Sequence, residues 1–274
     1  MSTPDIDRAL LGRPTWHRFL SPHYDDIALS CGGTAALLAG EGRAPEVLAV
    51  FGAEPDTREA LSGYAAAMHR TWGLDSSDVN ARRQSEERAA SVVLGTTFRV
   101  LPLRDAIYRG DAYLSDDDLF GHVAADDVML PDEIVEAAGL GGAPDPATRL
   151  YAPLAVGRHV DHQLVFTAGA QLAREGWDVW FYEDLPYALR EGALRDRLAT
   201  AAVDLTPAAI IDVTATWKAK MDAILAYPSQ LPAIFASVGS TGRRHEIDAL
   251  LRAYADRPEH GTLGERFWRL DGLQ

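Results

Sequence analysis

Cysteine is nearly absent from this chain: Cys31 is the only one among 274 residues. A single thiol excludes an intramolecular disulfide framework and a zinc cluster built from several cysteines. Any bound metal must therefore be held by histidine, aspartate or glutamate. Cys31 itself is expected to be a small packed residue and not a nucleophile, and Gly32 and Gly33 should let its helix approach the sheet closely.

Long apolar runs are missing as well. No stretch approaches the roughly 18 uninterrupted apolar residues that a membrane span needs. Residues Met1 to Pro14 mix aspartate, arginine and proline and lack the apolar centre of a signal peptide. We therefore expect a cytoplasmic protein without a membrane span. A chain of this length can bury one large core, so we expect a single domain over residues 1–274.

Basic residues are outnumbered: 26 lysines and arginines stand against 40 aspartates and glutamates, for a formal net charge of −14. Such a surface repels phosphate backbones, which argues against a nucleic-acid partner. The same field suits a neutral or cationic small-molecule substrate better than an anionic one. The acidic run Asp116-Asp117-Asp118 is interpreted as a solvated face or a helix start and not as a metal site. The composition leaves a homo-oligomer open.

Strand-like and helix-like patterns alternate along the chain. Short apolar runs predict strands at Trp16–Leu20, Pro45–Phe51, Thr97–Leu103, Arg149–Leu154, Trp177–Tyr182, Ala208–Val213 and Glu265–Leu270. Helical spacing predicts helices at Ala28–Ala39, Val79–Leu94, Leu130–Ala138, Asp161–Glu175, Trp217–Leu225 and Glu246–Ala255. Strands separated by helices predict an α/β fold with a largely parallel sheet covered on both faces.

The segment Ser21-Pro22-His23-Tyr24-Asp25-Asp26 joins the first strand to the first helix. Such a loop lies at the carboxyl edge of the sheet, where open α/β folds build their sites. His23 and Asp26 are three residues apart, so one loop can turn both toward one point and leave Asp25 free for another role. The bland alternative is that Asp25 or Asp26 caps the helix.

A second segment, Gly157-Arg158-His159-Val160-Asp161-His162, occupies the same position after the fourth strand. The alternative without a function is an ordinary turn whose imidazoles have hydrogen-bond partners. Two loops at the carboxyl ends of parallel strands can meet over the sheet, and because both segments fall on such loops we favour a His-Asp-His metal site. Glu183 and Asp184, after the fifth strand, lie at the right edge to line a pocket, whereas the tryptophans are more typical of core than of sugar-binding platforms.

Together the two segments resemble the LmbE/PIG-L family of metal-dependent N-deacetylases, whose members carry a His-Pro-Asp-Asp-Glu loop and a later His-x-Asp-His loop. Weaker similarities are Arg83-Gln-Ser-Glu86 followed by Leu94-Gly95, Asp105, Tyr227-Pro-Ser-Gln230 and Gly264-Glu265-Arg-Phe267. The resemblance implies a Rossmann-like three-layer α/β/α fold with the metal at the carboxyl ends of the strands. It also implies hydrolysis of an N-acyl, usually N-acetyl, amino sugar.

The resemblance assigns His23, Asp26 and His162 as metal ligands. Two histidines and one carboxylate leave an open position, as in catalytic zinc sites, although iron, cobalt or nickel would accept the same donors. Bound Zn²⁺ lowers the pKa of its water to about 7. This chain departs from the family pattern at Tyr24, which replaces the usual proline, and at Ile27, which replaces the usual glutamate. Neither change removes a ligand.

The resemblance further assigns Asp25 as the general base and His159 as the group that stabilises the oxyanion or protonates the leaving amine. Asp161 would hold the His159 ring, fix its tautomer and raise its pKa. Arg83 and Asp105 resemble substrate-contacting positions.

The leading prediction is thus a zinc-dependent hydrolase that removes an N-acetyl group from an amino sugar, a glycoside or a related small metabolite, with a role in natural-product biosynthesis on family grounds. A second reading keeps the metal chemistry on a different amide or ester. A third is a non-catalytic metal- or ligand-binding protein, for which Ile27 is the only hint and against which Asp25 argues. A nucleotide-binding Rossmann protein is the weakest, because the GxGxxG loop is absent.

Overall fold

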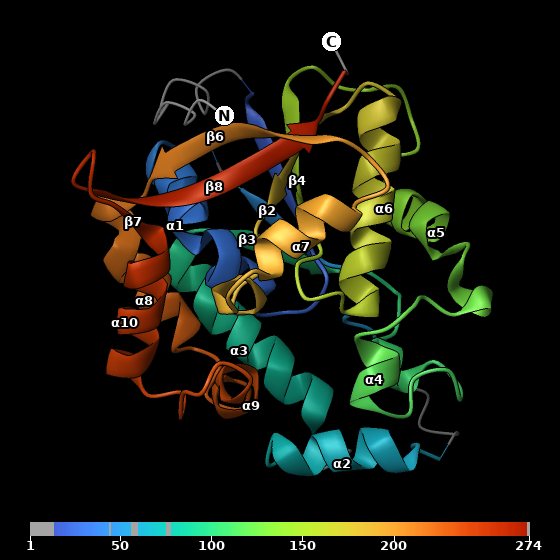
Figure 1. Ribbon diagram of the computed structural model, residues 1–274. Helices are drawn as coiled ribbons and strands as arrows, with labels where there is room; N and C mark the ends of the chain where they lie inside the picture. Colours follow the sequence, from blue (N-terminus) through green and yellow to red (C-terminus); the bar gives the residue numbers. More distant parts are fainter. Residues whose placement is uncertain (1–13, 44, 56–59, 75–77, 273–274) are drawn as a thin grey trace.

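The computed structural model describes residues 14–43, 45–55, 60–74 and 78–272. Its centre is one sheet whose main strands follow the order β3-β2-β1-β4-β5-β8-β6, with a short β7 paired to β8 (Figure 1). The strands are β1 Trp16–Ser21, β2 Glu46–Ala49, β3 Thr97–Val100, β4 Thr148–Pro153, β5 Asp178–Tyr182, β6 Leu205–Asp212, β7 Asp256–Arg257 and β8 Thr262–Leu270. Strands β1 to β5 pair with one another in parallel, and β8 runs antiparallel between β5 and β6. The predicted, mostly parallel sheet is confirmed.

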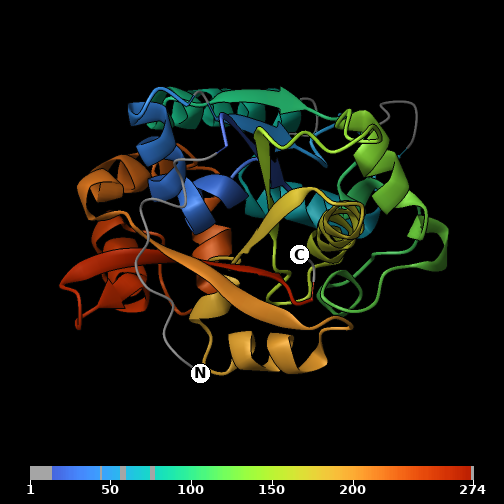
Figure 2. The same cartoon turned by 90° about the horizontal axis from the view of Figure 1, so that it is seen from above.

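Helices cover both faces of the sheet (Figure 2). Helices α1, α3 and α8 pack together, and α5 packs on α6, which contacts β4 and β5. The helices are α1 Asp26–Gly40, α2 Gly63–Thr71, α3 Val79–Leu94, α4 Asp116–Leu119, α5 Leu130–Ala137, α6 Val160–Arg174, α7 Ala193–Thr200, α8 Trp217–Ile224, α9 Leu231–Ala236 and α10 Arg244–Ala255. No described helix is long and apolar enough to cross a membrane. Residues 1–13, which carry most of the signal-peptide argument, lie outside the described part.

All six predicted helices are present; α2, α7 and α9 were not predicted, and α4 was anticipated only as a possible helix start at the acidic run. Each has between four and nine residues, too few to show a clear apolar period. Strand β6 begins three residues earlier than predicted and contains Pro207, next to a register shift against β8. Proline is tolerated there because β6 is an edge strand.

The two motif loops follow β1 and β4, which are neighbours in the sheet with Phe19 opposite Tyr151. The chain leaves β1 toward β2 and β3 on one side, and β4 and β5 extend the sheet on the other side. The connections therefore diverge between β1 and β4. In open α/β sheets this switch point leaves a crevice at the carboxyl ends of the strands, where ligands bind.

Helix α1 is broken at Cys31, whose φ of −139° and ψ of 28° are not helical. Just after the break, the main-chain N–H groups of Gly33 and Thr34 donate to the buried carboxylate of Glu265 on β8, at 3.0 and 2.7 Å. Lys220 of α8 pairs with the same carboxylate at 2.6 Å. A buried ion pair thus caps the second half of α1.

The close approach predicted for the glycine pair holds for one of the two. A Cβ on Gly33 would lie 2.6 Å from the Cβ of Val213, just after β6, whereas a Cβ on Gly32 would meet nothing closer than 3.5 Å. Cys31 is fully buried, as predicted for a packed residue.

Candidate metal centre and active site

The first motif forms a tight loop between β1 and α1. The main-chain N–H of His23 donates to Asp26 Oδ2 at 2.7 Å, which folds the loop back on itself. Asp25 occupies the N-cap position of α1, but its side chain makes no capping hydrogen bond. The bland explanation of Asp25 as a helix cap is therefore wrong. Its buried carboxylate lines the cavity above the sheet instead.

The three predicted ligands come together. One donor atom from each of His23, Asp26 and His162 can be chosen so that all lie within 4.8 Å of one another, and all three residues are buried. His23 Nδ1 lies 3.4 Å from one Asp26 oxygen, and His162 Nε2 lies 3.4 Å from the other. Burial by itself would raise the pKa of Asp26, but His162 and His23 lower it to about 2. The carboxylate is therefore ionised, as a metal ligand must be.

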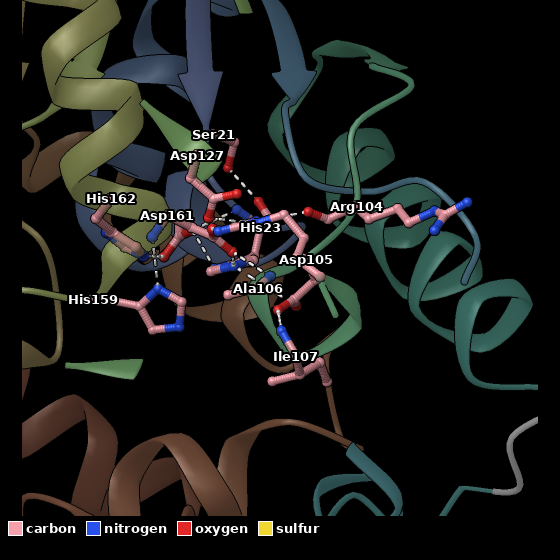
Figure 3. A network of polar contacts seen from close by, with 12 residues as sticks. Ser21, His23, Arg104, Asp105, Ala106, Ile107, Asp127, His159, Asp161 and His162 are labelled. Carbon is pink, nitrogen blue, oxygen red and sulfur yellow. Dashed lines mark hydrogen bonds and ion pairs between the residues drawn. The ribbon is translucent and has the colours of Figure 1, made fainter. Parts of the chain in front are cut away.

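The imidazoles of His23 and His162 each contact a buried carboxylate through the ring nitrogen that faces away from Asp26. His23 Nε2 lies 3.0 Å from Asp161 Oδ2, and His162 Nδ1 lies 2.6 Å from Asp184 Oδ1 (Figure 3 shows the His23 side). Metal-binding histidines usually donate their second ring N–H to such a partner, which fixes the tautomer and the ring orientation. His23 Nδ1 and His162 Nε2 then face Asp26 with lone pairs available.

The surroundings of the ring nitrogen Nε2 of His162 show whether a metal ion would fit this site. This nitrogen is buried and has no hydrogen-bond partner among the described residues. An unpaired buried nitrogen is costly, and a metal ion would satisfy it. The donor set of two imidazoles and one carboxylate suits zinc or a neighbouring transition metal.

A second possible ligand set, His23 with His159 and Asp161, is also close enough to hold an ion. Its carboxylate is already engaged: Asp161 lies 2.7 Å from Arg109 and accepts the main-chain N–H of Ala106 at 3.0 Å. Burial would raise the pKa of Asp161, but Arg109 and His23 hold it far below its usual range. The set with Asp26 and His162 is therefore the better candidate.

The structure corrects the expected contact between Asp161 and His159. The carboxylate of Asp161 pairs with His23, and only its main-chain N–H reaches His159, donating to Nδ1 at 3.2 Å (Figure 3). The expected rise in the pKa of His159 is wrong in direction: burial, followed by the neighbouring His23, lowers that pKa well below 6.5. Because Nδ1 accepts a hydrogen bond, the proton of the neutral ring sits on Nε2.

Arg83 and Asp105, expected to contact substrate, both line the cavity. Arg83 lies 3.5 Å from Asp105, and its guanidinium sits over the rings of Trp72 at 5.0 Å and Tyr24 at 5.5 Å. Tyr24, one of the departures from the family pattern, donates its hydroxyl to the carbonyl of Gly52 at 2.6 Å. It therefore ties the first motif to the chain that follows β2.

The cavity has a volume of about 410 Å³, within the usual range for small-molecule sites, ~300–1,000 Å³. The short helices α2, α4 and α9 supply much of its wall, and Figure 1 shows them together at the lower end of the molecule. The lining residues are Tyr64, Met68 and Thr71 of α2 with Trp72 directly after it, Asp116 and Leu119 of α4, and Ala233, Ile234 and Ala236 of α9.

Two predictions about the surroundings need correction, and one is confirmed. Trp72 lines the cavity and is not purely a core residue. The acidic run forms the first turn of α4, as the predicted helix start requires. In addition, Asp116 lines the cavity. Asp184 and Glu183 do not line it: Asp184 supports His162, and Glu183 bonds the Trp268 indole at 2.9 Å. The position of Asp184 at the end of β5, beside β4, was the signal that could have revealed its role.

Residues 18–173, more than half of the chain, match the family model described as PIG-L, GlcNAc-PI de-N-acetylase. The chain belongs to the PIG-L family. The matched segment contains both motif loops, which confirms the resemblance predicted from them.

Two relatives are 2'-N-acetylparomamine deacetylases. The protein of Streptomyces fradiae is 35% identical over 235 residues, 82% of this chain and 78% of that protein. The protein of Niallia circulans is 33% identical over 192 residues, 62% of this chain and 66% of that protein, just under two thirds of its length. A crystal structure of a deacetylase from the teicoplanin biosynthesis pathway shares the fold, with a TM-score of 0.74, 23% identity and coverage of 94% of this chain and 100% of that one. The two acetylparomamine deacetylases confirm the predicted class of protein, a hydrolytic enzyme, and the teicoplanin-pathway structure confirms the fold.

Two of the weaker sequence similarities to the PIG-L family, those around Glu86 and Tyr227, meet in one buried network. Glu86 of α3 accepts the hydroxyl of Ser229 at 2.6 Å, and Glu87 bonds the Tyr227 hydroxyl at 2.7 Å. That hydroxyl also lies 2.9 Å from the main-chain oxygen of Tyr24, inside the first motif. Burial raises the pKa of Glu87 to about 8. Helix α3 and the turn before α9 therefore support the loop of the first motif together.

Proposed function

We propose that this chain is a zinc-dependent hydrolase that removes an N-acetyl group from an amino sugar within a small metabolite. One observation carries the proposal: His23, Asp26 and His162 converge at the floor of a cavity that Asp25 also lines. A binding site alone has no need of a second buried carboxylate beside its ligands. The two acetylparomamine deacetylases support an acetylated amino sugar of a natural product as the substrate class.

His23, Asp26 and His162 would hold the metal, which when bound polarises the acetamide carbonyl and acidifies a water molecule. Asp25 takes a proton from that water as the water oxygen bonds to the carbonyl carbon. The proton then passes to the amide nitrogen as the C–N bond breaks, which releases acetate and the free amine.

His159 lines the cavity with its Nδ1 occupied by the Asp161 main-chain N–H. Its Nε2–H is thus available to donate to the carbonyl oxygen as negative charge develops there. A donor fixed in this way lowers the barrier by about 3 kcal/mol, because it needs no reorganisation during the reaction. Asp161 acts through His23, whose ring it holds toward the metal position.

The test combines metal content with acetate release. Wild type and Asp25→Asn are loaded with zinc, and acetate is measured with N-acetylglucosamine and with N-acetylparomamine. We expect about one equivalent of metal in both proteins, and a loss of at least 100-fold in kcat for Asp25→Asn, in line with the ~10²–10⁴-fold contribution of general bases. Acetate from neither compound with metal bound would reject the amino-sugar substrate, and failure of wild type to bind metal would reject the metal site.

A further inference from the structure

The cavity carries an excess of negative charge. Asp25, Asp26, Asp105 and Asp116 line it, and Arg83 is the only lysine or arginine among its described lining residues. Asp25 and Asp26 belong to the reaction centre, and Asp105 faces Arg83 at 3.5 Å. A doubly charged cation at the floor would balance the first pair. The charge of Asp116 is then the one that the reaction centre does not use.

Asp116 has no basic partner within the described part of the chain. The Tyr64 hydroxyl of α2 donates to its Oδ1 at 2.5 Å, and no ion pair to a lysine, arginine or histidine accompanies that bond. The side chain is solvent-exposed while it lines the cavity. Its carboxylate is therefore held in a fixed direction by a neutral group and keeps its acceptor capacity for another donor.

The ordinary reason for aspartate in the first turn of a helix is the helix dipole, which favours negative charge there. That reason applies equally to Asp116, Asp117 and Asp118 of α4. Their surroundings differ, however. Asp118 accepts the Ser115 hydroxyl at 2.7 Å, and Asp117 is exposed and is not part of the cavity wall. Only Asp116 faces the cavity, so a role in helix formation does not account for its position.

We propose that Asp116 binds a protonated amine of the substrate, so that the preferred substrate is an N-acetyl amino sugar carrying at least one further, unacetylated amine. The inference rests on the proposed function for the acetamide end, and it adds a recognition site for the remainder of the molecule. A charge-assisted hydrogen bond from an ammonium group is about twice as strong as a neutral one. The net charge of −14 adds attraction for a cationic molecule during approach.

The experiment measures binding directly, so that it does not depend on turnover. Zinc-loaded wild type, Asp116→Asn and Asp117→Asn are titrated by calorimetry with paromamine, a polyamine, and with N-acetylglucosamine, which has no free amine. We expect wild type to bind paromamine at least 10-fold more tightly than N-acetylglucosamine. Asp116→Asn should lose about 10-fold in affinity for paromamine and less than twofold for N-acetylglucosamine. Asp117→Asn, the matched control from the same helical turn, should change neither affinity by more than twofold.

Equal loss in Asp116→Asn and Asp117→Asn would overturn the inference, because it would report only the overall charge. An Asp116→Asn variant that binds paromamine as wild type does, or a wild type without preference for paromamine, would also overturn it. Acetate release from N-acetylparomamine, followed in the same preparations, reports separately on the hydrolase: the expected binding pattern without acetate would reject the proposed function and leave the amine site standing.

Discussion

His162 and Asp184 are joined by a buried hydrogen bond of 2.6 Å between Nδ1 of the imidazole and Oδ1 of the carboxylate. The contact connects α6 to the chain just after β5 and leaves His162 Nε2 facing Asp26 at 3.4 Å. The pair mirrors His23 and Asp161 on the other side of the site. Both histidines of the proposed ligand set are thus oriented by aspartates from outside that set.

Asp184→Asn should weaken metal binding by about 10–100-fold, because an amide holds the imidazole less firmly and lowers its basicity. Competition with a chromophoric chelator at fixed pH measures the zinc affinity. Asp178→Asn, at the exposed start of β5, the strand that Asp184 follows, is the control and should leave the zinc affinity unchanged. Wild-type affinity in a folded Asp184→Asn would contradict the orienting role.

The buried pair of Lys220 and Glu265 provides a test of stability. Lys220→Met leaves the Glu265 carboxylate buried without its cation and should lower the free energy of unfolding by about 3–5 kcal/mol. The double variant Lys220→Met/Glu265→Gln should lose less than this single variant, since no charge is then buried, although the single amide oxygen of Gln can replace only one of the two carboxylate oxygens that accept from Gly33 and Thr34. Urea unfolding of the two variants decides the point. A double variant less stable than Lys220→Met would show that the second acceptor oxygen contributes more than removal of the buried charge.

Glu87 should make stability depend on pH. Its pKa is about 8 in the folded protein, against 4.5 for an ordinary glutamate, so the folded state holds a proton that the unfolded state has released between these values. Stability from this group is therefore complete below pH 4.5 and is lost as the pH rises toward about 8, at roughly 1.4 kcal/mol per pH unit.

Glu87→Gln removes this titration and keeps a hydrogen-bonding side chain, so the stability of the variant relative to wild type should increase from pH 5 to pH 8. Urea unfolding at each pH measures the difference. Glu133→Gln, an exposed position on α5, serves as the control and should follow wild type. A pH-independent difference for Glu87→Gln would show that Glu87 is not protonated in the folded protein.

Arg158, next to His159, has a φ of +68°, a conformation that costs a residue with a side chain about 1–2 kcal/mol. Arg158→Gly should therefore be more stable than Arg158→Ala by roughly 1 kcal/mol, since both variants lose the same side-chain contacts and only glycine relieves the backbone. Thermal unfolding of the two variants, compared with each other, measures the effect. Equal stabilities would mean that the loop relaxes around the alanine.

Much of the fold could be predicted because its strands and longer helices show clear apolar patterns, as Trp16–Leu20 and Asp161–Glu175 do. The direction of β8 could not, because an antiparallel strand carries the same pattern of buried residues as a parallel one. Helices α2 and α9 were missed, and α4 was anticipated only as a helix start, because all three are short; the cavity wall that they form was missed with them.

The sequence by itself determined the chemistry at the floor of the site. His23, Asp25 and Asp26 share one loop, His159 and His162 share another, and local strand-to-helix patterns are enough to place both loops at one edge. Only the tertiary structure decided what surrounds them: that Asp161 supports His23, that Asp184 supports His162, and that Asp116 faces the cavity. These contacts join positions 22 to 138 residues apart, or depend on the direction of one side chain in a short helix, and no local pattern encodes either.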